Sequence, residues 1–297
     1  MPSAPTSEAG SRKYTVQMIL SFGPGSGDSP ATVFALSVPS LLGLFFYILA
    51  AQQSERFKST LRTALLLGWM AHGVAILVDT AGIGSAVAGA RFGFAPALSM
   101  TLWMVLAVYG VESRVVPLPG VRRTLALLGV AVVLLAWLFP GESRPQAPSP
   151  WAPVHWALGL ASYGLFGVAV LHAVMLNRAE RQMRNRDLSA APRELPKGLP
   201  LLRLERLTFR FVTAGFAVLS AAVLLGAWYA NPWRWDHKTV LSILGWIVFA
   251  GLLAGRRAFG WRGLRATSWL YAGAMLLLLA YAGSRFVFEV LLHKVPV

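Results

Sequence analysis

Two histidines in tryptophan-rich segments are the residues of this chain best suited to bind a metal. His155 lies in the segment WAPVHW (residues 151–156), and His237 lies in WRWDHKT (residues 233–239). A neutral imidazole is a common ligand of iron, copper and zinc. Tryptophan is also enriched where helices leave the membrane, so the alternative is an aromatic belt that contains two interfacial histidines.

The other three histidines have different surroundings. His72 lies near the middle of an apolar segment. A polar ring there is costly, and it marks either a functional site or a side chain hydrogen-bonded to a neighbouring helix. His172 lies shortly before Arg178, so we expect it near a membrane interface, and we expect His293, in the C-terminal tail, to be inert.

Long apolar segments must position these residues. The chain is 56% hydrophobic and only 13% charged. Crossing about 30 Å of hydrocarbon takes about 20 mainly apolar residues, and a helix satisfies its backbone groups within the segment. The sequence therefore predicts an all-α fold, a polytopic membrane helical bundle of about eight transmembrane helices. The predicted spans are residues 31–51, 61–79, 93–110, 122–139, 153–177, 208–230, 238–254 and 267–287.

We expect one transmembrane domain over residues 31–292. Residues 1–30 are polar and rich in glycine, serine and proline. This composition predicts a disordered outer tail, or residues that precede a true start at Met18. Within the fifth span, small residues predict close helix contacts, because helix association in lipid depends on van der Waals packing. These residues are Ala157, Ala161, Gly164 and Gly167.

The net charge of +15 is unevenly distributed. Most of the 27 basic residues lie in or beside the first, third, fifth and seventh connections between the predicted helices. By the positive-inside rule these connections are cytoplasmic, so both termini lie on the outer side. The charge therefore indicates topology and some attraction to anionic lipid, and we expect no nucleic-acid partner. His155 and His237 then lie at similar depth in the outer leaflet.

Three segments resemble the cytochrome c assembly protein family, CcsA/HemX-like. HWALGLASYGLF (residues 155–166) resembles the family's His-x-x-apolar-Ser-Tyr-small-apolar-Phe helix. WRWDHKTVLSILGW (residues 233–246) is similar to a second family segment that begins Trp-x-Trp-Asp. GWRG (residues 260–263), followed by AYAGSR (residues 280–285), also fits. The resemblance covers nearly all of residues 35–292, and it is to a short, eight-span branch of the family.

This resemblance implies haem handling at the outer face during assembly of c-type cytochromes. His155 matches the family's first outer histidine, His237 falls within the second segment, and His72 matches an intramembrane histidine by position. The expected axial ligands of the haem iron are His155 and His237. The other expected haem contacts are Trp156, Trp233 and Trp235 on the porphyrin, Arg234 or Lys238 on the propionates, and Asp236, which would orient an imidazole or cap the seventh helix.

The chain has no cysteine, so thioether attachment is impossible and the expected cofactor is non-covalent haem b. The outer connection over residues 140–152 is short and lacks the tryptophan-rich segment of larger family members. We therefore expect an accessory haem-binding factor of the bacterial inner membrane, and not a synthase or other enzyme. The expected partners are haem, the lipid bilayer and other cytochrome c assembly membrane proteins.

Two alternatives come from other functional classes. A small-solute transporter would use His72, Asp79 and the Gly82/Gly84 region as a path through the bundle, without iron. A structural or regulatory membrane protein would use its histidines only as hydrogen-bonding groups. An absorbance spectrum separates the classes, because only haem gives a Soret band.

The charge distribution generates a topological prediction. Reporters fused at residue 190 and at residue 260 should be cytoplasmic, and a reporter at residue 145 should be external, because basic connections stay inside. Paired alkaline phosphatase and fluorescent-protein fusions measure this. An external reporter at residue 190 would contradict the assignment.

Overall fold

The computed structural model describes residues 30–52, 58–81, 90–113, 121–140, 142–144, 151–184, 201–229 and 235–287. This part of the chain is almost entirely helical, as the sequence predicts. Seven helices are long and apolar enough to cross a membrane, and the apolar part of α1, Ser37–Gln52, is shorter. The helices are α1 (Pro30–Gln52), α2 (Lys58–Thr80), α3 (Phe94–Glu112), α4 (Val121–Leu138), α5 (Ala152–Arg184), α6 (Leu201–Tyr229), α7 (His237–Phe259), α8 (Gly263–Leu278), the π-helical turn η1 (Leu279–Gly283) and α9 (Ser284–Phe286).

The predicted spans agree with the observed helices, and the main differences lie at polar ends. The fifth span was predicted to end at residue 177, but α5 continues to Arg184. The sixth was predicted to begin at residue 208, but α6 begins at Leu201. Hydropathy detects the part of a helix that lies in hydrocarbon, whereas arginine and glutamate are good helix formers that extend it into water. The predicted tail, residues 1–30, lies outside the described residues apart from Pro30.

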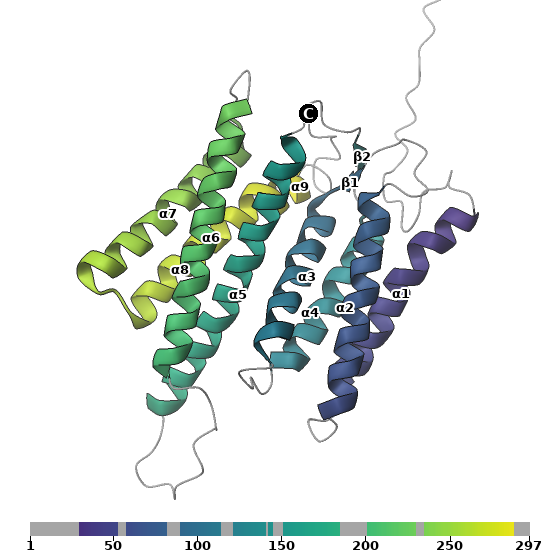
Figure 1. The fold of residues 1–297 in the computed structure, drawn as a ribbon, viewed down its shortest axis with the longest axis horizontal. Helices are drawn as coiled ribbons and strands as arrows, with labels where there is room; N and C mark the ends of the chain where they lie inside the picture. The colour runs from purple at the N-terminus through teal and green to yellow at the C-terminus, as the bar shows by residue number, and fades with distance from the viewer. Residues whose placement is uncertain are drawn as a thin grey trace, which may run out of the picture.

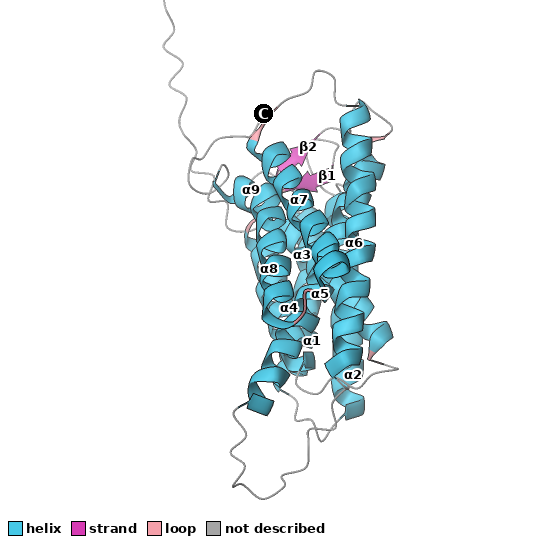
Figure 2. Cartoon of the chain, turned by 90° about the vertical axis from the view of Figure 1, so that its left-hand side faces the viewer, coloured by secondary structure: helices cyan, strands magenta, loops and turns pink. Residues whose placement is uncertain are grey.

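Two short strands were not predicted. β1 (Ala90–Phe92) and β2 (Glu142–Arg144) pair antiparallel, with Arg91 opposite Ser143. They join the connection before α3 to the connection before α5, and Figure 2 shows them at one end of the helices. Strands of three residues are too short to produce a recognisable alternation of polar and apolar residues.

The bundle has two halves, α1–α4 and α5–α8, which meet where α3 packs against α5 (Figure 1). Each half has its own apolar core, one around Tyr47 and one around Phe249. At the junction, an added Cβ at Gly164 would lie 2.8 Å from Met104, and one at Gly167 would lie 2.7 Å from Val105. These two glycines therefore allow the close approach of α5 to α3, as the small-residue pattern predicts.

Tyr47 is the central side chain of the first half. It is completely buried, and its ring lies between Gly68 of α2 and Gly129 of α4. A Cβ at either glycine would come within 2.8 Å of a ring carbon. The absence of two side chains thus makes the space that one aromatic ring of α1 fills, and this contact holds three helices together.

The two ends of the bundle differ in charge. We call the end where α5 begins the His155 end; β1, β2, the start of α1 and the end of α9 also lie there (Figure 1). We call the opposite end, where α5 ends and α6 begins, the basic end. Described basic residues there include Arg62, Arg123, Arg178, Arg203 and Arg257. The basic connections of the sequence are therefore gathered at one end, as the topology requires.

The packing of Tyr47 generates a stability prediction. Gly129→Ala should lower the free energy of unfolding by about 1–3 kcal/mol, because the new methyl group overpacks a closed core. Gly110→Ala is the matched control: its Cβ meets no atom within 4 Å, and alanine stabilises a helix by about 0.5–1 kcal/mol relative to glycine. Thermal unfolding in detergent measures both. Equal midpoints for the two variants would show that Tyr47 is not tightly enclosed.

Candidate functional site

A cavity of about 290 Å³ opens at the His155 end. Its walls come from α3, α5, α6 and α7, and from the region of α8 and η1. Most of the lining is apolar, which is typical of a site for a largely apolar ligand with a few polar groups that orient it. The lining residues that can hydrogen-bond through their side chains are Thr101, His155, Trp156, Ser162, Tyr163, Lys238, Ser242 and Tyr281.

His155 is held in one orientation by α6. Its Nδ1 lies 2.9 Å from the carbonyl oxygen of Ala222. A carbonyl can only accept, so Nδ1 must carry the hydrogen and donate it, which makes Nε2 the nitrogen with the lone pair. This is the arrangement by which proteins prepare a histidine to bind a metal through Nε2. Gly226 makes room for the ring, because a Cβ there would lie 2.8 Å from His155 Cε1.

The register of α7 brings Lys238, and not His237, into the wall of the cavity. Lys238 and Ser242 are four residues apart and line it together, as residues one helical turn apart do. Lys238 Nζ lies 5.3 Å from the centre of the Tyr281 ring, a cation–π distance. His237 precedes Lys238, so it is turned by about 100° around the helix, and its side chain is exposed.

Asp236 caps α7. Its Oδ1 accepts a hydrogen bond of 2.7 Å from the backbone N–H of Thr239, which confirms the predicted N-cap. Burial alone would raise the pKa of Asp236, but the hydrogen bonds from Thr239 and the nearby charge of Lys238 hold it below its ordinary value. Trp235 is exposed, and Trp233 and Arg234 lie outside the described residues.

Tyr163 closes the inner part of the cavity. Its hydroxyl donates a hydrogen bond to the carbonyl oxygen of Leu277, just before the π-helical turn η1. π-Helical turns inside α-helices are frequent at functional sites. Here the turn begins two residues after Leu277, and Tyr281 within it lines the cavity.

His72 lies in a separate place, between α1, α2 and α3. Tyr47 Oη lies 3.1 Å from its Nδ1, and Ser99 Oγ lies 2.7 Å from its Nε2. The cavity beside it measures about 30 Å³ and is also lined by Ser40 and Asp79, so it is much smaller than the cavity at His155. Gly82 and Gly84 lie outside the described residues. The hydrogen-bonded interpretation of His72 accounts for this geometry.

His172 is fully buried and not exposed at an interface. Its Nε2 lies 2.9 Å from Glu112 Oε2, although the angles of this contact do not satisfy those of a hydrogen bond. The pair joins α5 to α3, on the seam between the two halves. Glu112 is the last residue of α3, and the position of His172 near a membrane interface stays a prediction. His293 lies outside the described residues.

Comparison with known proteins identifies the family. A sequence profile of the cytochrome c assembly protein family matches residues 32–292. This chain belongs to that family. The inner membrane protein YpjD of Escherichia coli is 33% identical over 194 residues, which are 64% of this chain and 71% of that protein. The cytochrome c biogenesis protein CcsA of Prochlorococcus marinus is 22% identical over 222 residues, 64% of this chain and 70% of that protein. No solved structure matches.

The family assignment agrees with the resemblance found in the sequence, and the eight-span branch is the one that YpjD represents. An uncharacterized protein of Azospirillum brasilense is also 32% identical over 154 residues, half of this chain and 56% of that protein. The seven helices long and apolar enough to cross a membrane make this chain a multi-pass membrane protein. The predicted inner-membrane location agrees with the name of its E. coli relative.

Some site residues escaped the sequence analysis although a signal was present. His155, Gly159, Ser162 and Tyr163 follow the spacing of one helix face, and all four line the cavity. This spacing could have identified Tyr163. By contrast, Thr101 of α3 carries no local signal, because only the packing of distant helices brings it to the cavity. Tyr281 lies in the segment AYAGSR (residues 280–285), but the segment does not specify that its ring lines the cavity.

Proposed function

We propose that this protein binds haem non-covalently in the cavity at the His155 end and acts as an accessory factor in c-type cytochrome assembly. The observation that carries the proposal is the orientation of His155. A carbonyl of α6 fixes its tautomer, and the ring belongs to a mainly apolar cavity. An apolar macrocycle with two carboxylates suits such a cavity, whereas a small hydrophilic solute does not.

The residues present fit this group. His155 would hold the iron through Nε2, and Trp156 would cover part of the porphyrin. Lys238, the cationic residue of the lining, would meet a propionate. When bound, haem supplies an iron centre whose potential depends on its axial ligands. The contribution of this chain is to orient one imidazole, exclude water with an apolar wall and place a positive charge at the rim.

The second axial ligand in this proposal is His237. Its position at the first turn of α7, next to Lys238, puts it at the same end of the bundle as His155. To bind the iron its ring must turn inward from its exposed position, whereas His155 needs no such movement. Arg234 keeps its proposed role on a propionate, Trp235 its proposed role on the porphyrin, and His72 its proposed role at an intramembrane site. Asp236 serves α7 as a cap, so we propose no further role for it.

The proposed role in assembly rests on the family and its relatives. CcsA proteins in the same family are named for cytochrome c biogenesis. The sequence of the connection over residues 140–152 is short and contains no extended tryptophan-rich segment, so we propose haem binding or delivery to other assembly proteins of the membrane, without synthase activity. The solute path through His72 and Asp79 would have to pass a cavity of only about 30 Å³, against about 290 Å³ at His155, which favours haem over a transported solute.

The proposal predicts an absorbance spectrum. The detergent-purified protein, alone or with added haem, should show a Soret band. His155→Gly should weaken haem binding at least about tenfold, a change of roughly 1.4 kcal/mol, and free imidazole should partly restore it by occupying the vacated space. His237→Ala should shift the reduced spectrum.

His293→Ala is the control and should leave both the spectrum and the haem content unchanged. If the double variant His155→Ala, His237→Ala retains the wild-type spectrum and haem content, the ligand pair is wrong. The aromatic-belt interpretation of both segments would then replace it. A colourless protein that takes up no haem would contradict the proposed function as a whole.

A further inference from the structure

The basic end of the second half carries a dense group of arginines around the turn between α7 and α8. This turn contains Gly260, at φ +62°, and Gly263, at φ +55°, values that favour glycine. The chain therefore reverses within a few residues, and the last turn of α7 comes next to the first turn of α8. We call the arginines of this turn the hairpin cluster: Arg256, Arg257, Arg262 and Arg265.

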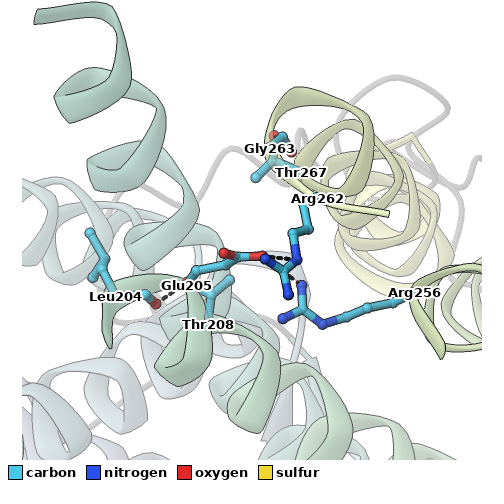
Figure 3. A network of polar contacts seen from close by, with 7 residues as sticks. All are labelled: Leu204, Glu205, Thr208, Arg256, Arg262, Gly263 and Thr267. Atoms are coloured by element: carbon cyan, nitrogen blue, oxygen red, sulfur yellow. Dashed lines mark hydrogen bonds and ion pairs between the residues drawn. The ribbon is translucent and has the colours of Figure 1, made fainter. Parts of the chain in front are cut away.

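One carboxylate serves two members of the hairpin cluster. Arg256 Nη1 donates a hydrogen bond of 2.9 Å to Glu205 Oε1 of α6, and Arg262 Nε lies 4.0 Å from the same oxygen. Figure 3 shows both guanidinium groups directed at Glu205. Glu180 is the other carboxylate beside the turn in the described part of the chain; its oxygens lie about 4 Å from where a Cβ of Gly263 would be. Two carboxylates therefore lie beside four guanidinium groups, and positive charge is left over.

Aromatic rings support two of these guanidinium groups. Arg256 lies 3.6 Å from the centre of the Phe209 ring, and Arg265 lies 4.5 Å from that of Trp261. A guanidinium group whose face rests on a ring still presents its N–H edges, which match the oxygens of a phosphate. Arg262 adds an exposed group: 70% of its side chain is accessible.

Large apolar side chains surround the same charges. Phe259 is 77% exposed and Leu264 is 47% exposed, in the residues directly before and after the turn. Trp269 is also partly exposed and contacts Trp261. Apolar and cationic groups that alternate in this way are typical of a surface at the boundary between headgroups and acyl chains.

We infer that the hairpin cluster binds the phosphate of an anionic phospholipid headgroup, while Phe259 and Leu264 contact its acyl chains. A soluble anion would use the charges alone and make no contact with these apolar side chains. The positive-inside rule puts this end at the cytoplasmic leaflet, which carries anionic lipid. The site lies at the opposite end of the bundle from His155 and does not depend on haem.

The test uses the detergent-solubilised full chain and native mass spectrometry. Short-chain phosphatidylglycerol should bind, and phosphatidylcholine of the same chain length should bind much more weakly. The double variant Arg262→Gln, Arg265→Gln keeps the Arg256–Glu205 pair. It should weaken phosphatidylglycerol binding about fivefold for each arginine removed, with no change for phosphatidylcholine. If this variant does not yield folded protein, Arg257→Gln, which is exposed on α7, should give a single fivefold loss.

The matched control is Arg62→Gln, Arg123→Gln. It removes the same charge from exposed positions at the same end, on α2 and α4, and should change phosphatidylglycerol binding less than twofold. Equal losses in the two double variants would mean general surface charge and would overturn the site. Equal binding of the two lipids would overturn it as well. Inorganic phosphate that competes as effectively as the lipid would assign the cluster to a soluble anion instead.

Discussion

Hydrocarbon contains no water, so each polar side chain within a membrane bundle has to find its hydrogen-bond partner inside the protein, on its own helix or on a neighbouring one. This constraint decides where the polar residues of this protein lie. Trp69 and Trp103 donate to each other's backbone carbonyls at 3.0 Å across α2 and α3. Tyr163 donates to the carbonyl of Leu277, and the ring of His155 donates to that of Ala222. In each case a side chain of one helix uses a backbone carbonyl of another.

The same constraint gives the histidines different properties. His72 has hydroxyl partners on both ring nitrogens and only a small cavity beside it, so it joins α1, α2 and α3. His172 faces a carboxylate on the seam between the halves. His155 is fixed through Nδ1 by a carbonyl, which assigns the lone pair to Nε2, and it lies in a large cavity. Its environment is the one that prepares an imidazole for a metal.

The helices could be predicted from the sequence, because an apolar segment must be long enough to cross the hydrocarbon of the membrane. The family could be predicted because the motifs at residues 155–166 and 233–246 are specific. The walls of the cavity could not. The choice between His237 and Lys238 depends on a rotation of about 100°, and a motif does not specify the rotation of a helix about its axis. The seam between the halves also escaped prediction, since Glu112 and His172 are far apart in the sequence and neither has a local signal for the other.

The central claim is that His155 binds haem iron through Nε2, with Nδ1 held by the Ala222 carbonyl. Hyperfine spectroscopy of haem-loaded protein with ¹⁵N-labelled histidine tests it most directly. Wild-type protein should show strong ¹⁵N coupling from an axial imidazole. In His155→Gly loaded with unlabelled imidazole, the part of that coupling that comes from His155 should be lost and replaced by ¹⁴N coupling from the free imidazole, while the part from His237 remains. If the ¹⁵N coupling persists unchanged in His155→Gly, the iron is held by another histidine and the claim is wrong.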